Sequence, residues 1–310
     1  MYHELASAHQ CGSRSIHDMA KRQARQDVIR HMVEPFKAAC VIGWPVAHSR
    51  SPMIHNHWIS QLGLDAEYRR EGVPPEQFAD FVSHLAERGY VGANVTVPHK
   101  EVALRLADAD ARAQAVGAAN TLWFERGVLK ATNTDVEGFI GNLDASAPGW
   151  DHELRTAVVL GAGGSARAIV FGLIERGIAR IYIANRSVER AKALRDQFGK
   201  AIDPRPFGEA NQLLGEAGLL VNTTTLGMSG QPPLALDLDR LPASATVADI
   251  VYSPLETALL AAARRRGLRA VGGLGMLLHQ AVGGFERWFG IRPQVTDELR
   301  ALVEADLLPK

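Results

Sequence analysis

The feature that most constrains the fold is an apolar run that passes into a glycine-rich turn and then into a helical pattern. Residues 158–166 read VVLGAGGSA and match the pattern G-x-G-x-x-G/A. Here Gly161 permits a tight turn, Gly163 lets backbone N–H groups approach a pyrophosphate, and Ala166 allows close helix packing. An ordinary glycine-rich loop is the alternative, but the flanking strand and helix favour a dinucleotide-binding βαβ unit. The predicted binding loop comprises Gly161, Ala162, Gly163, Gly164, Ser165 and Ala166.

The next predicted strand, residues 180–184, indicates which dinucleotide binds. It is followed by Asn185, Arg186 and Ser187, with Arg190 one helical turn further on. Enzymes that use NAD place an acidic residue at this strand end to bind the ribose 2′-hydroxyl, and these three positions hold none. A guanidinium can bind a 2′-phosphate through paired hydrogen bonds and stack on adenine. The pattern therefore favours NADP over NAD, with two solvated surface arginines as the alternative interpretation.

The remaining sequence alternates short apolar strands with amphipathic stretches, which predicts an α/β fold built around mainly parallel sheets. A chain of 310 residues exceeds the roughly 250–300 residues that one core supports, so two domains are expected. A polar stretch at 144–151 separates them by composition. The predicted elements are strand 39–43, helix 51–62 with Ser51 as a capping residue, strand 68–73, helix 75–88, strand 92–97, strand 156–160, helix 165–176, strand 180–184, helix 188–198, and strands near 219–222 and 246–251.

Composition excludes several classes of partner. With 34 basic and 34 acidic residues the formal net charge is zero, so no strong field attracts a phosphate backbone, and nucleic acid is not expected. No apolar run reaches the roughly 18–20 residues that span a bilayer, and no secretory signal is present. Cys11 and Cys40 form neither a disulfide framework nor a CxxC pair, which favours a reducing cytoplasm.

Three histidines, His48, His55 and His57, raise the question of a metal site. A helix after Pro52 places His55 and His57 on different faces, because residues two apart on a helix do not face each other. No metal is therefore expected. Residues 1–31 are polar and lack strand alternation, and we interpret them as a leader outside the fold, with Met32 as an alternative start.

Two segments of the first half carry side chains suited to binding a small polar substrate. Ser49 and Ser51 precede a predicted helix N-terminus, where hydroxyl and backbone donors can hold a carboxylate, although Ser51 could equally be a plain cap. Asn94, Thr96 and Lys100 lie at and beyond the end of a predicted strand, where open α/β sheets bind ligands. A lysine at that place is a candidate proton donor.

Taken together and in order, the motifs resemble the shikimate dehydrogenase family. They are HSRSP (48–52), GANVTVPHK (92–100), GAANT (117–121), NTD (133–135), GAGGSA (161–166), NRS (185–187), DIVY (249–252) and GLGMLLHQ (273–280). Their order and spacing extend the resemblance from about residue 41 to residue 288.

The resemblance implies a role for each matching residue. Lys100 and Asp135 would form the catalytic pair, and Ser49 and Ser51 would hold the substrate carboxylate. It also implies that Ile250 and Gly273 frame the nicotinamide end of NADP. The residues implied to bind ring hydroxyls or complete the pocket are Asn94, Thr96, Asn120, Asp135, Tyr252 and Gln280.

The resemblance further implies a discontinuous first domain and an activity. Residues 32–134 would form the substrate-binding catalytic domain, 135–271 the Rossmann-type NADP-binding domain, and 272–310 helices that return to the first domain. The implied reaction is the reversible NADPH-dependent reduction of 3-dehydroshikimate to shikimate, in aromatic amino acid (chorismate) biosynthesis, by a monomer or homodimer. The alternatives are a quinate/shikimate dehydrogenase on the same scaffold and a non-catalytic NADP-binding regulator, against which the retained Lys100 and Asp135 argue.

Some positions depart from the family's usual pattern without removing a hydroxyl, amine or carboxylate from the implied site. They are His99, Val136, the run Thr223-Thr224-Thr225, Gly275 and Ala281. Because His99 is adjacent to Lys100, we expect it to add a charge near neutrality and to alter the pH response.

Overall fold

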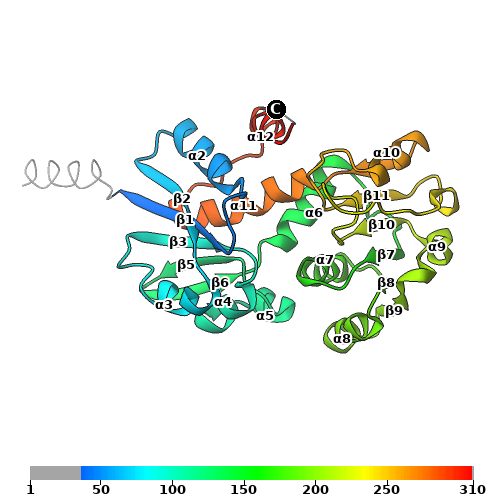
Figure 1. The fold of residues 1–310 in the computed structure, drawn as a ribbon, viewed down its shortest axis with the longest axis horizontal. Coiled ribbons are helices and arrows are strands. Elements are labelled where there is room, and N and C mark those ends of the chain that lie inside the picture. Colours follow the sequence, from blue (N-terminus) through cyan, green and yellow to red (C-terminus); the bar gives the residue numbers. More distant parts are fainter. Residues whose placement is uncertain (1–35, 309–310) are drawn as a thin grey trace, which may run out of the picture.

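The computed structural model describes residues 36–308, which form two six-stranded sheets with helices packed on them. Figure 1 shows the first sheet on the left, the second on the right, and the helices α6 and α11 running between them. The predicted leader, 1–31, lies outside the described residues. None of the helices within 36–308 is long and apolar enough to cross a membrane.

The first sheet has the strand order β2-β1-β3-β5-β6-β4. It is mainly parallel, as predicted: five of its six strands run in one direction, and β5 runs antiparallel to its neighbours β3 and β6. Its elements are β1 (Lys37–Gly43), α2 (Ser51–Gln61), β2 (Ala66–Gly72), η1 (Pro75–Gln77), α3 (Phe78–Ser83), β3 (Tyr90–Val95), α4 (Lys100–Leu106), β4 (Asp108–Ala109), α5 (Ala111–Val116), β5 (Thr121–Glu125) and β6 (Val128–Thr132).

The second sheet is parallel throughout and has the order β12-β11-β10-β7-β8-β9, which is the doubly wound order of a Rossmann fold. The strand order reverses between β7 and β10, so the glycine loop after β7 lies at the switch point where such sheets bind ligands. Its elements are β7 (Thr156–Leu160), α7 (Gly164–Glu175), β8 (Arg180–Asn185), α8 (Val188–Phe198), β9 (Ile202–Pro206), η2 (Phe207–Glu209), α9 (Ala210–Leu213), η3 (Leu214–Glu216), β10 (Leu219–Asn222), η4 (Leu238–Arg240), β11 (Thr246–Asp249), α10 (Ala258–Arg265) and β12 (Arg269–Val271).

Two helices tie the sheets together, α6 (Asp135–Ser146) and α11 (Leu274–Phe289). They cross closely because Gly275 has no side chain: an added Cβ would lie 1.8 Å from Asn142 Oδ1. Helix α11 and the last helix, α12 (Asp297–Leu307), then share an apolar core with β1 and α2. The Trp288 indole also donates a hydrogen bond to the Leu122 carbonyl of β5 at 2.8 Å. The expected return of the C-terminal helices to the first half is therefore confirmed.

One predicted helix, 75–88, is wrong in length. Its apolar spacing is real, since Phe78 and Leu85 are fully buried, but the α-helix ends at Ser83 and turns follow. The Ser83 hydroxyl donates to the Asp80 carbonyl at 2.8 Å, and His84 Nδ1 contacts the same oxygen at 2.9 Å. The His84 backbone N–H still donates to that oxygen at 3.3 Å. The next N–H, that of Leu85, donates to the Val82 carbonyl three residues back at 3.2 Å, and the α-helical pattern ends there.

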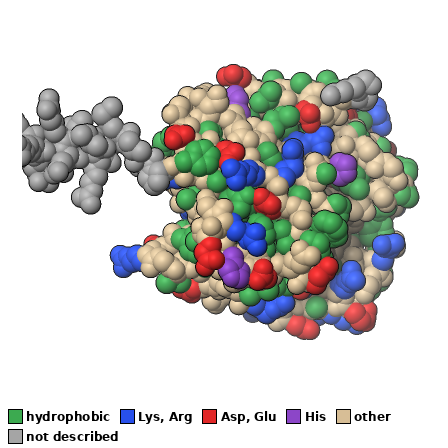
Figure 2. Space-filling view, turned by 60° about the vertical axis from the view of Figure 1, so that its left-hand side comes forward, with side chains coloured by type: hydrophobic (Ala, Val, Ile, Leu, Met, Phe, Trp, Pro, Cys, Tyr) green, Lys and Arg blue, Asp and Glu red, His purple; other side chains and the backbone are tan. Residues whose placement is uncertain are grey.

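The predicted cap at Ser51 is also wrong, because Arg50 occupies the N-cap position without a side-chain bond and Ser51 is the first helical residue. The hairpin of β5 and β6 was not predicted. Its turn is Arg126-Gly127, in which both residues have positive φ. On the face shown in Figure 2, acidic and basic side chains are interspersed, in keeping with the zero formal net charge.

Candidate active site

A cavity of about 360 Å³ lies between the carboxyl ends of the first sheet and the helix α11. Every residue predicted to be catalytic or to bind substrate lines it, and so do three of the residues predicted to bind cofactor. The two sets are Ser49, Ser51, Asn94, Thr96, Lys100, Asn120, Asp135, Tyr252 and Gln280, and Ser165, Ile250 and Gly273. The structure thus gathers residues from distant parts of the sequence around one space, while their roles stay predictions.

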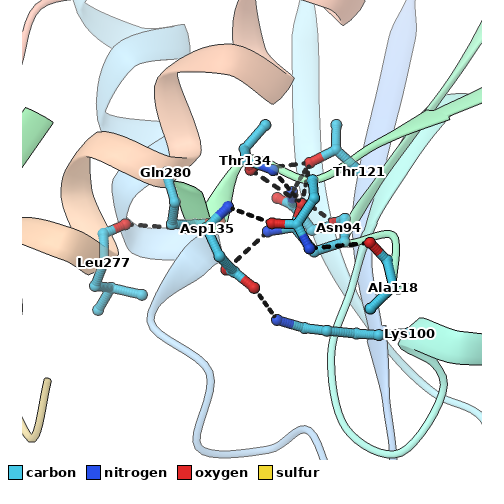
Figure 3. Close-up of polar contacts among 10 residues, drawn as sticks. Asn94, Lys100, Ala118, Thr121, Thr134, Asp135, Leu277 and Gln280 are labelled. Carbon is cyan, nitrogen blue, oxygen red and sulfur yellow. Dashed lines mark hydrogen bonds and ion pairs between the residues drawn. The ribbon is translucent and has the colours of Figure 1, made fainter. Parts of the chain in front are cut away.

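The shortest polar contact of the cavity joins Lys100 to Asp135 (Figure 3). Lys100 Nζ lies 2.5 Å from Asp135 Oδ2, and both side chains are largely but not fully buried. Lys100 is the first residue of α4, and Asp135 is the first residue of α6. Asp135 Oδ1 accepts a second hydrogen bond from Asn120 Nδ2 at 2.9 Å, which fixes the plane of the carboxylate. The arrangement presents one ammonium group at the cavity wall with a carboxylate holding it in place.

Behind this pair lies a buried network of amides and hydroxyls that the sequence did not reveal. Asn120 Oδ1 accepts from the Thr134 backbone N–H at 2.8 Å, and Thr121 Oγ1 lies 3.1 Å from Thr134 Oγ1. Asn94 donates to Thr121 Oγ1 at 3.2 Å. Because every member has a partner, the network holds Asn94 and Asn120 rigidly at the cavity wall.

Tyr68 is a further residue that sequence analysis missed. Its hydroxyl donates to Asn94 Oδ1 at 2.7 Å, and this bond fixes the orientation of the Asn94 amide, with its oxygen toward Tyr68. Burial raises the pKa of Tyr68 well above its usual range, so the hydroxyl stays protonated and remains a donor. The ring stacks on His55, with centroids 4.1 Å apart. Only its place at an apolar strand position could have indicated that Tyr68 is buried.

His55 itself is enclosed by aromatic rings, and neither ring nitrogen has a hydrogen-bond partner in the described residues. Burial lowers the pKa of His55 to about 3, so the imidazole is neutral at physiological pH. His57 is only partly buried. Within 36–308 no group of three or more His, Cys, Asp or Glu side chains is placed to hold a metal ion.

The serine loop, residues 48–51, also lines the cavity. The Ser51 backbone N–H donates to Ser49 Oγ at 3.3 Å, so the Ser49 hydroxyl hydrogen remains available to a ligand. Ser51 is buried at the start of α2, where backbone N–H groups also point outward. Two hydroxyls and a helix N-terminus together form an environment suited to a carboxylate.

The glycine loop fits a dinucleotide. Gly161 has φ +103°, and an added Cβ would lie 2.6 Å from Thr223 Oγ1, so only glycine is tolerated there. At Gly163 and Gly164 an added Cβ would meet no protein atom, which leaves open space above the loop. The first turn of α7 has no side-chain cap, so its backbone N–H groups are available to an anion. Ala166 is fully buried against the sheet, as expected for the third small position.

A second cavity, of about 260 Å³, lies over this loop and is lined by Ala162, Gly163, Gly164 and Arg190. Five further lining residues were not predicted, and two of them, Arg167 of α7 and Glu101 of α4, are charged. These two form an ion pair at 3.6 Å that joins the two halves of the chain beside the glycine loop.

The end of β8 adjoins the glycine loop, where the Gly161 N–H donates to the Ala184 carbonyl at 2.9 Å, but of the predicted residues 185–187 and Arg190 only Arg190 lines that cavity. Arg186 and Ser187 are exposed, and Asn185 Nδ2 donates to the Ser187 carbonyl at 2.8 Å, which shapes the turn into α8. The guanidinium groups of Arg186 and Arg190 have no partner in the part of the chain that the structure describes. Two unpaired cations are therefore available near the loop.

The turn between β12 and α11 lies against the residues that follow β11. An added Cβ on Gly273 would lie 2.2 Å from the Ile250 carbonyl, so the two backbones touch. Buried Asp249 holds this region by accepting from the Val251 N–H at 3.1 Å and the Thr257 hydroxyl at 2.7 Å. Gln280 donates to the Leu277 carbonyl at 3.0 Å, and both Gln280 and Tyr252 line the cavity.

The expectation that His99 adds a charge near neutrality is wrong. His99 is buried, stacks on Phe78 with centroids 4.3 Å apart, and contacts the Val73 carbonyl through Nε2 at 2.8 Å. Burial lowers the pKa of His99, because the imidazolium would lose its hydration. The imidazole therefore fills an aromatic place in the core, and His99 is not among the residues that line the cavity with Lys100.

The other departures also have structural explanations. Val136 packs in a small core with Val116 and Ala168, and Thr223 Oγ1 donates to the Leu160 carbonyl at 2.7 Å. Ala281 is buried in the core that α11 shares with β1 and α2.

Comparison with known proteins identifies the family. Family models match residues 41–122 (shikimate dehydrogenase substrate binding domain), 145–229 (shikimate / quinate 5-dehydrogenase) and 273–303 (shikimate 5′-dehydrogenase C-terminal domain). A shikimate dehydrogenase (NADP(+)) of Rhodopseudomonas palustris strain TIE-1 is 66% identical over 274 residues, which cover 88% of this chain and 98% of that protein. The chain belongs to the shikimate dehydrogenase family. The resemblance drawn from the ordered motifs is confirmed.

Solved structures of the shikimate dehydrogenase family share the fold. The shikimate 5-dehydrogenase of Thermus thermophilus, in complex with NADP(H) and shikimate, superposes with a TM-score of 0.76 at 33% identity, covering 88% of this chain and all (100%) of that one. The quinate dehydrogenase of Corynebacterium glutamicum, in complex with NAD, gives 0.79 at 30% identity, covering 87% and 100%. The predicted two-domain α/β fold is confirmed.

Proposed function

We propose that this chain is an NADP-dependent shikimate dehydrogenase, which reversibly reduces 3-dehydroshikimate to shikimate in aromatic amino acid biosynthesis. The observation that carries the proposal is the Lys100–Asp135 pair, held at 2.5 Å in a cavity that nucleotide-domain residues complete. Family membership and relatives of 63–67% identity named as shikimate dehydrogenase (NADP(+)) support it.

The residues of the cavity account for the proton and the orientation of the substrate. When bound, NADPH supplies the hydride to the ketone carbon. Lys100 donates a proton from Nζ to the ketone oxygen as negative charge develops on it, and takes that proton back in the oxidative direction. Asp135 orients the ammonium through Oδ2 and binds the neighbouring ring hydroxyl. Asn120 keeps the carboxylate plane fixed throughout.

The serine loop supplies the carboxylate site in this proposal. Ser49 donates its free hydroxyl hydrogen, and Ser51 adds a second hydroxyl at the start of α2. Asn94, Thr96, Asn120, Tyr252 and Gln280 hold the ring hydroxyls or close the pocket. The two short serines match the planar carboxylate of shikimate. Quinate carries an additional hydroxyl on the ring carbon to which its carboxylate is attached. We therefore propose shikimate over quinate.

For the cofactor, we propose that the glycine loop holds the pyrophosphate and that Arg186 and Arg190 bind the 2′-phosphate. Their unpaired guanidinium groups support this assignment. The backbone around Ile250 and Gly273 would bound the nicotinamide end. We further propose the division into 32–134, 135–271 and 272–310, a cytoplasmic location, and a monomer or homodimer.

The test is a direct assay. Purified protein is mixed with NADP⁺ and either shikimate or quinate, and NADPH absorbance is followed; the same substrates are then offered with NAD⁺. We expect reduction of NADP⁺ with shikimate to be the most efficient of the four reactions. Equal efficiency with quinate would move the assignment to a quinate/shikimate dehydrogenase, and no turnover would favour a non-catalytic binding protein.

A further inference from the structure

The loop that carries Ser49 is held from outside by a guanidinium that the proposed mechanism does not use. Arg70, on strand β2, donates to the Ser49 carbonyl from both Nε, at 3.0 Å, and Nη2, at 2.8 Å. Both donors of one planar group thus converge on a single backbone oxygen. Such a pair fixes the orientation of the peptide unit that follows Ser49.

The interactions of Arg70 differ from those of an ordinary surface arginine. It has no acidic partner among residues 36–308, whereas its neighbour Arg69 forms an ion pair with Glu67. Successive strand residues point to opposite faces, so Arg69 projects away from the serine loop. An exposed arginine gains little from a backbone carbonyl that water could also satisfy. Structural stability alone therefore explains the arrangement poorly.

A second arginine anchors the same loop to the end of the chain. Arg50 donates from Nη1 to the His48 carbonyl at 2.6 Å and from Nε to Asp306 Oδ2 at 2.9 Å. Asp306 belongs to α12, 256 positions along the chain. Two successive carbonyls of the loop, those of His48 and Ser49, thus each accept hydrogen bonds from an arginine. Ser49 itself lines the cavity.

We propose that Arg70 is a positioning residue for the substrate carboxylate, with the Arg50–Asp306 pair as a second anchor of the same loop. The inference rests on the proposed function, in which Ser49 and Ser51 bind that carboxylate. Arg70 keeps the Ser49 hydroxyl aimed at the ligand and places an unneutralised positive charge behind an anionic subsite. Its contribution is to substrate affinity and not to the hydride or proton step.

The first test compares Arg70→Met with the matched control Arg69→Met, the adjacent residue on the same strand. For Arg70→Met we expect the KM for shikimate to rise about 5- to 10-fold, the range for charge-assisted bonds at an exposed site, with kcat and the KM for NADP⁺ little changed. Asp306→Asn should raise the same KM by a smaller factor. Arg69→Met should leave all three constants at wild-type values. A fall in kcat with unchanged KM in Arg70→Met would overturn the proposal.

The second test asks whether the loss is specific to the carboxylate. The preference for shikimate over its neutral methyl ester, measured as a ratio of kcat/KM, should fall about 5- to 10-fold in Arg70→Met, because the ester has no negative charge to hold. An unchanged ratio would mean a general structural effect and would reject the assignment.

A Ser49→Ala variant separates this inference from the function on which it rests. We expect Ser49→Ala to raise the KM for shikimate as well. If it does and Arg70→Met does not, the carboxylate site stands and the role of Arg70 is refuted. If neither variant changes KM, the carboxylate site itself is misplaced, and the role of Arg70 falls with it.

Discussion

Replacing Lys100 by Met tests the proposed proton donor while keeping most of the side-chain volume. General acid–base catalysis typically contributes about 10²–10⁴-fold, or roughly 2.7–5.4 kcal/mol of transition-state stabilisation, so kcat should fall by that factor. KM for shikimate should change little, since other residues hold the substrate. Steady-state kinetics followed by NADPH absorbance give both constants.

The structure also predicts what the same substitution does to stability. Without Lys100, the largely buried Asp135 carboxylate keeps only the Asn120 bond at 2.9 Å. Leaving a partly buried charge with one partner missing should lower the free energy of unfolding by about 1–3 kcal/mol. The double variant Lys100→Met/Asp135→Asn should recover that stability without recovering kcat. A folded Lys100→Met enzyme with kcat within tenfold of wild type would refute the role of Lys100.

Four further substitutions test other parts of the argument. Arg186→Ala should reduce the preference for NADP⁺ over NAD⁺, in kcat/KM, by about tenfold, since one charge-assisted phosphate contact is lost; an unchanged preference would exclude Arg186 from the 2′-phosphate site. Tyr68→Phe should raise the KM for shikimate, because Asn94 loses the donor that orients its amide; a normal KM would show that the orientation is set elsewhere. His55 has a folded-state pKa of about 3 against an ordinary 6.5, so its contribution to stability is full above pH 6.5 and is lost as the pH falls toward 3. Wild type should therefore lose about 2 kcal/mol more than His55→Phe between pH 8 and pH 5 in urea denaturation, and equal losses would contradict the burial of a neutral imidazole. His99→Phe should leave the pH profile of kcat unchanged, because burial lowers the pKa of His99 and keeps it neutral; a displaced profile would place His99 in the chemistry.

The cofactor half shows how far sequence reasoning reaches. The strands at 156–160 and 219–222 and the helix at 188–198 have the predicted bounds. Each is a local pattern, in which buried strands read as apolar runs and a surface helix repeats its apolar positions with helical spacing. The glycine turn at Gly161 is similarly local, since positive φ is a property of a single residue.

The candidate site was identified through the order of its motifs, which brought forward the residues proposed to contact substrate directly. The side chains that support them were not identifiable in this way. Tyr68 reads as an ordinary strand residue, and Arg70 and Asp306 read as solvated charges. Their importance depends on which residue each one touches, and Asp306 meets Arg50 across 256 positions of sequence.

The sequence by itself determined the two α/β halves, the nucleotide-binding loop and the residues proposed to bind substrate and transfer the proton. Tertiary structure decided how these are held. It ended the helix predicted over 75–88 at Ser83, where the Leu85 N–H bonds the Val82 carbonyl three residues back, and it buried His99 against Phe78. The free-energy contribution of a charge or a hydrogen bond depends on its desolvation and on its partner. Both are set by packing between segments that are distant in the sequence.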